Sequence, residues 1–232
     1  VMSPILTRLY TPDDFGVLAL FISITTIFGT IANAKYELAI VLPKKEEDSI
    51  NIVALCLLIS TAVSLLLFIL IIVFHKEIIT ILDNEEISIW LYFIPLVVFF
   101  IGLFNTLNYL NTRMKTFGII AKVKVIKAVS MTTVQIGLGF TKAGVSGLII
   151  GQIISHLFAN GRLGKELYKK KNLFKEIKKK NIIYQAIRYR NFPLYNLGAT
   201  LSNALSHNST NIFIPLLYST TVLGHYSLVQ RV

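Results

Sequence analysis

The stretch INIVALCLLISTAVSLLLFILIIVF, residues 50–74, contains no charged side chain. A helix needs roughly 20 predominantly apolar residues to cross the hydrocarbon of a bilayer, because it rises about 1.5 Å per residue. Further apolar runs approach this length at residues 15–34, 87–110, 119–140, 143–161 and 193–217. The sequence therefore predicts an all-α, polytopic integral membrane protein.

The composition supports the same class. Hydrophobic residues make up 54% of the chain and charged residues 15%, whereas a soluble domain averages about 25% charged residues. Mean hydropathy is +0.65. The first residues read as a helix tail entering a turn, and GHYSLVQRV at 224–232 reads as the start of another helix. We therefore expect the chain to be a fragment of a longer protein.

The basic residues predict the orientation, because cytoplasmic loops retain lysine and arginine. With residues 1–14 outside, 19 of the 23 basic residues fall on the inside and three, Arg8, Lys76 and Lys142, fall outside, with Arg231 unassigned. The segment 162–192 is expected to be a basic cytoplasmic loop that attracts anionic phospholipids. This explains the formal charge of +11 without nucleic acid as a partner.

One predicted span has an unusual start. Residues 119–140 place Lys122, Lys124 and Lys127 in the first turns. We expect these lysines to reach back to the inner interface, because a long basic side chain near a helix end can place its charge in the headgroup region.

Helical spacing also brings polar residues together within predicted spans. In 143–161, small residues recur at every fourth position, which permits close helix packing, and Gln152 and His156 follow one residue later. Asn105 and Asn108 share a face of the preceding long span. The run 191–217 carries Asn196, Asn203 and His207. Because polar groups that face lipid are costly, these stripes predict a polar central cavity.

Other interpretations of these residues remain open. Each asparagine alone can bridge two helices, and a histidine can take part in proton coupling. No Cys, Asp or Glu accompanies the histidines at ligand spacing on the same spans, so we expect no metal and no other cofactor. No catalytic motif is visible, so an enzyme is not expected. Glu37 is expected to be neutralised by Lys35 or a neighbouring group.

Several segments in order resemble a known family. They are TRLYTPDDFGVLALF (7–21), AKYELAIVLPKKEED (34–48), NYLNTRMKTFGIIAKVKVIKA (108–128), YRNFPLYNLGATLSNALS (189–206) and LGHYSLVQRV (223–232). Together they resemble the polysaccharide biosynthesis proteins, the O-antigen and oligosaccharide flippases of the multidrug/oligosaccharidyl-lipid/polysaccharide exporter superfamily. The resemblance covers essentially the whole chain.

The resemblance implies a two-lobe transporter of about twelve or more helices in the bacterial cytoplasmic (inner) membrane. Residues 1–161 would then hold helices two to six of the first lobe, residues 162–192 the basic loop, and residues 193–232 helix seven with the beginning of helix eight. The implied function is translocation, by alternating access, of a polyprenyl-pyrophosphate-linked oligosaccharide for polysaccharide, O-antigen, lipopolysaccharide or capsule biosynthesis. A multidrug exporter of the same superfamily is the alternative.

The implied partners are the lipid-linked oligosaccharide, anionic phospholipids and a coupling ion, Na⁺ or H⁺. Amide and imidazole side chains suit an uncharged sugar, because they donate and accept hydrogen bonds. A pyrophosphate requires a cation, and Lys35 and Arg231 are the predicted ligands.

Overall fold

The computed structural model describes residues 3–82, 84–168 and 175–230. Within them the regular structure is helical throughout, which confirms the predicted all-α class. The elements are α1 (Ser3–Leu9), α2 (Pro12–Ile31), η1 (Tyr36–Val41), α3 (Glu46–Val73), α4 (His75–Leu82), α5 (Ser88–Leu91), α6 (Ile94–Arg113), α7 (Phe117–Phe140), α8 (Val145–Tyr168), α9 (Lys179–Arg188), η3 (Phe192–Asn196), α10 (Leu197–Leu217) and α11 (Thr220–Gln230).

Three of the described helical segments are long and apolar enough to cross a membrane, namely Pro12–Ile31, Glu46–Val73 and Ser88–Arg113. The other three predicted spans correspond to α7, α8 and α10, which have 24, 24 and 21 residues. Their length suffices, but they carry more polar and charged side chains. For these three helices, crossing of the bilayer stays a prediction.

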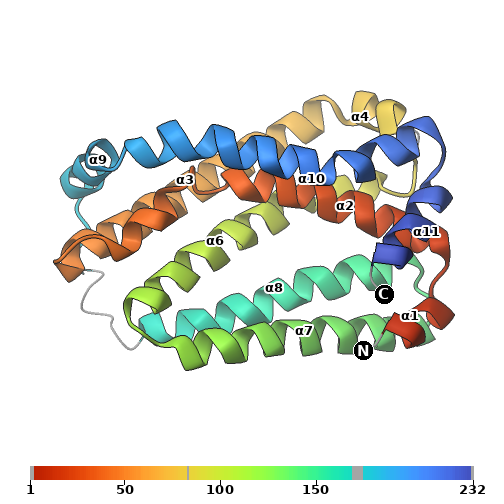
Figure 1. Ribbon diagram of the computed structural model, residues 1–232, viewed down its shortest axis with the longest axis horizontal. Coiled ribbons are helices and arrows are strands. Elements are labelled where there is room, and N and C mark those ends of the chain that lie inside the picture. The colour runs from red at the N-terminus through yellow and green to blue at the C-terminus, as the bar shows by residue number, and fades with distance from the viewer. Residues whose placement is uncertain (1–2, 83, 169–174, 231–232) are drawn as a thin grey trace.

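The long helices run along one common direction (Figure 1). At one end lie α9 and the turns that follow α2 and α6, while α1, α4 and α11 gather at the other end. The predicted cytoplasmic loops therefore lie together at the α9 end. The α8 helix continues to Tyr168 and α9 begins at Lys179, so the segment expected as a basic loop at 162–192 is partly helical.

The α2 helix occupies the centre of the bundle. Its side chains Phe15, Leu18, Leu20 and Phe21 are almost completely inaccessible, and α2 contacts α6, α8, α10 and α11. In contrast, the second half of α3 exposes large apolar side chains such as Leu66 and Ile69. A contiguous apolar surface of this kind marks a membrane or protein interface, which agrees with α3 as a lipid-facing span.

The end of α2 is set by an abrupt turn. Ala34 and Lys35 have φ values of +48° and +64°, a left-handed conformation that non-glycine residues seldom adopt. The turn stops the helix and places the Lys35 side chain back beside the bundle.

A buried polar cluster ties this turn to two neighbouring helices. The Asn33 side-chain amide donates to the Gly102 carbonyl oxygen at 2.8 Å and to Thr106 Oγ1 at 3.1 Å. Its Oδ1 atom accepts a hydrogen bond from the Ser60 hydroxyl. Asn33 is 2% exposed, so the end of α2 is fixed to α3 and α6 by bonds shielded from water.

Replacing Asn33 with leucine is expected to lower the free energy of unfolding by roughly 1–3 kcal/mol, because it leaves buried groups without partners. The measurement is the thermal unfolding midpoint of the purified protein in detergent. Asn191→Leu is the matched control, since Asn191 is exposed and its side chain caps no helix. Equal midpoints for the two variants would contradict a stabilising role of the cluster.

The predicted small-residue stripe of α8 packs as expected. A Cβ atom on Gly151 would lie 3.1 Å from the Met131 carbonyl oxygen and 2.5 Å from Gln135 Cγ. One on Gly147 would lie 3.0 Å from Leu138 Cβ. The α7 and α8 helices are thus held together along the half of their contact that lies nearest to their connecting turn.

Candidate functional site

A cavity of about 330 Å³ lies among α2, α6, α7 and α8. Its lining combines hydroxyl, amide, imidazole and ammonium groups with a few apolar side chains: Ile22, Thr25, Thr26, Gly29, Thr30, Lys35, Ile101, Phe104, Asn105, Lys127, Gln152 and His156. Four residues predicted from the sequence, Lys35, Asn105, Gln152 and His156, therefore share one cavity.

The α2 wall is made of threonines that the sequence analysis did not single out. The Thr25 hydroxyl donates to the Phe21 carbonyl oxygen at 2.9 Å, and the Thr30 hydroxyl donates to that of Thr26 at 2.9 Å. These donations within the helix satisfy the hydroxyl protons and leave oxygen lone pairs as acceptors. The signal was present in the sequence, since Thr26 and Thr30 are four residues apart on one helical face.

Asn105 and Gln152 supply the amide groups of the cavity. Both side chains are half-buried, and among the described residues neither makes a side-chain hydrogen bond. Each amide offers two N–H donors and a carbonyl acceptor. The two helices α6 and α8 thus bring unused donors and acceptors to the same space.

Lys127 points into the bundle. Its Nζ atom lies 3.3 Å from His156 Nε2 and 5.4 Å from the centroid of the Phe104 ring. An ammonium group can only donate, so Nε2 accepts, and the histidine is neutral with its proton on Nδ1. That Nδ1 atom is buried without a partner among the described residues.

The expectation that Lys127 reaches the inner interface is therefore wrong, whereas Lys122 and Lys124 are exposed. All three lysines lie on the first turns of α7, and only the packing of α7 against α6 and α8 distinguishes them. Lys127, like the threonines of α2, is a cavity residue that sequence reasoning missed.

The second cation of the cavity is paired. Lys35 Nζ lies 3.9 Å from Glu37 Oε1, as expected from the sequence. Burial raises the pKa of the Glu37 carboxyl above its ordinary value, and the nearby Lys35 charge partly opposes this shift. Lys127 has no carboxylate within ion-pair distance among the described residues, and its charge gives the cavity a net positive character.

The remaining predicted residues lie elsewhere. Asn108 is on α6, one turn beyond Asn105, with a buried Oδ1 atom that lacks a described partner. Asn196 ends η3 and is half-buried, while Asn203 and His207 are exposed on α10. None of these four is in the cavity lining, and Arg231 lies outside the described residues.

Long apolar helices and a polar cavity at the bundle centre define an all-α membrane protein. The chain belongs to the family described as polysaccharide biosynthesis protein, which matches residues 5–232. No curated protein and no solved structure matches the chain. Membership of this family gives the protein a role in polysaccharide biosynthesis or export.

Proposed function

We propose that the protein is a flippase that moves a polyprenyl-pyrophosphate-linked oligosaccharide across the bacterial cytoplasmic membrane, for O-antigen, lipopolysaccharide or capsule assembly. It acts as a transporter and not as an enzyme. The observation that carries the proposal is Lys127, a cation inside a polar cavity without a carboxylate partner among the described residues. A partly desolvated cation requires a compensating negative charge, and a pyrophosphate supplies it.

The other groups of the cavity match the rest of the cargo. The amides of Asn105 and Gln152 and the hydroxyl oxygens of α2 offer hydrogen bonds to sugar hydroxyls at no cost in charge. Binding of pyrophosphate to Lys127 would also compete with its contact to His156. The polyprenyl chain can stay in the surrounding lipid, so the cavity needs to enclose only the polar portion.

Alternating access is the mechanism that we propose for translocation. In this scheme residues 1–161 belong to one lobe and residues 193–232 begin the second. The contact of α11 with the start of α2 closes the end of the bundle that holds α1 and α4. Separation of α2 and α11 would open the cavity to that side. The coupling ion would be Na⁺ or H⁺, and Glu37 is a protonatable group beside Lys35.

The cavity disfavours the alternative, a multidrug exporter for cationic compounds. Its described lining contains two lysines and no carboxylate. Such a lining repels organic cations, since like charges in a partly desolvated space destabilise each other.

The decisive experiment locates the lipid-linked oligosaccharide in cells depleted of the protein, with a sugar label that reaches only the outer face of the membrane. Accumulation on the inner face with loss of outer label is the expected result. Unchanged outer labelling, in a strain without a second flippase, would overturn the proposal.

A variant pair tests the cavity itself. Asn105→Leu combined with Gln152→Leu is expected to lower outer labelling at least tenfold, because two groups that bind sugar are replaced by apolar ones; tenfold corresponds to about 1.4 kcal/mol. Asn191→Leu combined with Gln230→Leu removes the same chemical groups at positions outside the cavity and is expected to transport normally. Normal labelling by the cavity pair would show that these amides do not contact cargo.

A further inference from the structure

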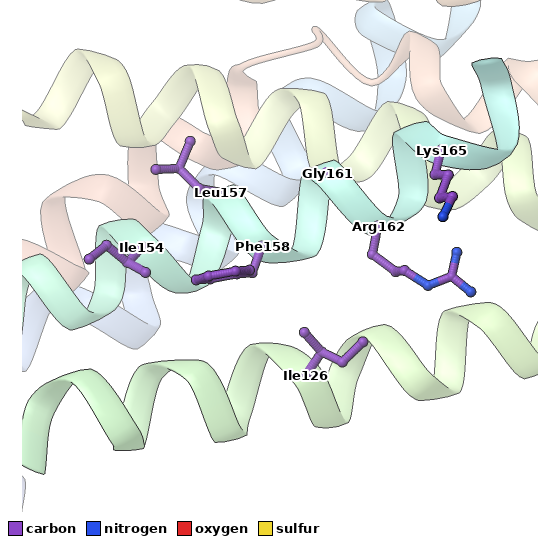
Figure 2. A pocket seen from close by; sticks show the side chains of 7 residues that line it. All are labelled: Ile126, Ile154, Leu157, Phe158, Gly161, Arg162 and Lys165. Atoms are coloured by element: carbon purple, nitrogen blue, oxygen red, sulfur yellow. The ribbon is translucent and has the colours of Figure 1, made fainter.

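A second hollow lies between α7 and α8, with a volume of about 540 Å³ (Figure 2). It is lined by Ile126 of α7 and by Ile154, Leu157, Phe158, Gly161, Arg162 and Lys165 of α8. Because 154, 158, 162 and 165 are three or four residues apart, they form one stripe along α8. Gln152 and His156 lie about 200° around the helix from Ile154 and Phe158, so this groove is on the face opposite the polar cavity.

The groove arises where the close packing of α7 and α8 ends. Gly147 and Gly151 have no space for a Cβ atom, whereas a Cβ atom on Gly161 would meet nothing within 4 Å. Figure 2 shows Arg162 directed toward α7 and Ile126 directed back toward α8, while the Phe158 ring lies along α8. The opening thus lies between the two helices and is bordered by side chains from both.

The chemistry of the groove changes along its length. Leu157 and Phe158 are 49% and 57% exposed, and with Ile154 and Ile126 they form an apolar floor. Arg162 and Lys165 lie at the end of the groove nearest the α9 end of the bundle, which is the predicted cytoplasmic side. Large exposed apolar side chains on a membrane helix contact lipid chains, and cations at the same helix end lie at headgroup level.

We propose that this groove binds an anionic glycerophospholipid of the cytoplasmic leaflet. Its phosphate lies between Arg162 and Lys165, and an acyl chain follows Phe158 and Ile154 toward the middle of the membrane. A guanidinium group can donate two parallel hydrogen bonds to two phosphate oxygens, while the lysine ammonium contributes a point charge. Basic pockets between transmembrane helices on the cytoplasmic side are known to favour anionic headgroups. The site shares no lining residue with the polar cavity.

The charge of the site is tested with the double variant Arg162→Gln/Lys165→Gln. The protein is purified in detergent, and retention of phosphatidylglycerol is compared with that of phosphatidylethanolamine by native mass spectrometry. Wild type is expected to retain phosphatidylglycerol preferentially, and the variant to bind it at least tenfold more weakly. The control Lys44→Gln/Lys45→Gln removes two exposed basic residues from another predicted cytoplasmic segment and is expected to bind as wild type.

The shape of the site is tested with Gly161→Leu, because Gly161 lines the groove and a Cβ atom there meets nothing within 4 Å. Gly137→Leu is the control, because Gly137 is also exposed on a long helix and open to added atoms, but it lies about three turns from Ile126. Loss of phosphatidylglycerol retention in Gly161→Leu, with an unchanged thermal midpoint in lipid-free detergent, supports the site.

Three results would overturn the proposal. Equal loss of binding in the Lys44/Lys45 control would show diffuse attraction to basic residues. Equal retention of the two lipids by wild type would show that the groove does not select an anionic headgroup. Preferential retention of polyprenyl phosphate over phosphatidylglycerol would assign the groove to the carrier lipid. The depletion experiment with surface sugar label is unaffected by any of these results.

Discussion

Replacing Lys127 with methionine is expected to reduce translocation of the lipid-linked oligosaccharide by roughly 10- to 100-fold. The change keeps an unbranched four-atom stem and removes the ammonium group. A hydrogen bond to a charged group contributes roughly 1.5–3 kcal/mol, and each 1.4 kcal/mol corresponds to about a factor of ten. Initial rates of appearance of the outer sugar label measure the effect.

The control for this prediction is Lys124→Met. Lys124 is on the same helix but is exposed, and it is absent from the cavity lining. The Lys124→Met variant is expected to transport normally. Lys127→Arg should retain more activity than Lys127→Met, because arginine keeps a cation in the cavity. Equal activity of Lys127→Met and Lys124→Met would rule out a binding role for the buried ammonium.

Replacing Gly224 with alanine is expected to lower the thermal unfolding midpoint, because it forces two helix backbones apart. A Cβ atom there would lie 1.8 Å from the Pro12 carbonyl oxygen, and one on Gly16 would lie 2.1 Å from that of Thr220. Both obstacles are backbone atoms, so the helices must move apart. Overpacking of this kind costs roughly 1–3 kcal/mol, which for a chain of this size lowers the unfolding midpoint by roughly 2–12 °C.

Gly198→Ala is the matched control for Gly224→Ala. Gly198 is within α10, and a Cβ atom there meets nothing within 4 Å. Because alanine favours a helix over glycine by roughly 1 kcal/mol, this control should be neutral or slightly stabilising. A midpoint for Gly224→Ala equal to that of the control would mean that α2 and α11 are not in close contact in the folded protein. That result would also remove the support for our proposal that α2 and α11 close the end of the bundle that holds α1 and α4.

Much of the fold followed from the local pattern of residues. Uncharged runs such as 50–74 have few alternatives to a buried or membrane-spanning helix, because backbone polar groups in an apolar medium must bond within the segment. The small-residue stripe of α8 likewise predicted a close helix contact, since only glycine and other small residues allow backbones to approach. The orientation was inferred from basic residues, and it stays a prediction.

The candidate site was predicted only in part. Helical spacing identified Gln152 and His156 as one face, and Asn105 as another, because spacing along a helix fixes which side chains share a face. The sequence predicted that these faces meet in a central cavity, but it did not include the threonines of α2 in the wall. It also assigned Asn196, Asn203 and His207 to the cavity, and they are not in its lining. Asn160 follows the same spacing as His156, yet its amide donates to the Phe100 carbonyl oxygen at 3.0 Å and bridges two helices.

The sequence by itself determined the helical class, the approximate limits of the long helices and the family. The tertiary structure decided which polar groups share a space and which are used in packing. Lys122, Lys124 and Lys127 show the difference most clearly. They begin the same helix with the same charge, and only Lys127 lies beside His156 and Phe104. The physical reason is that the rotation of α7 about its axis is set by its contacts with α6 and α8, which the spacing of residues within α7 does not specify.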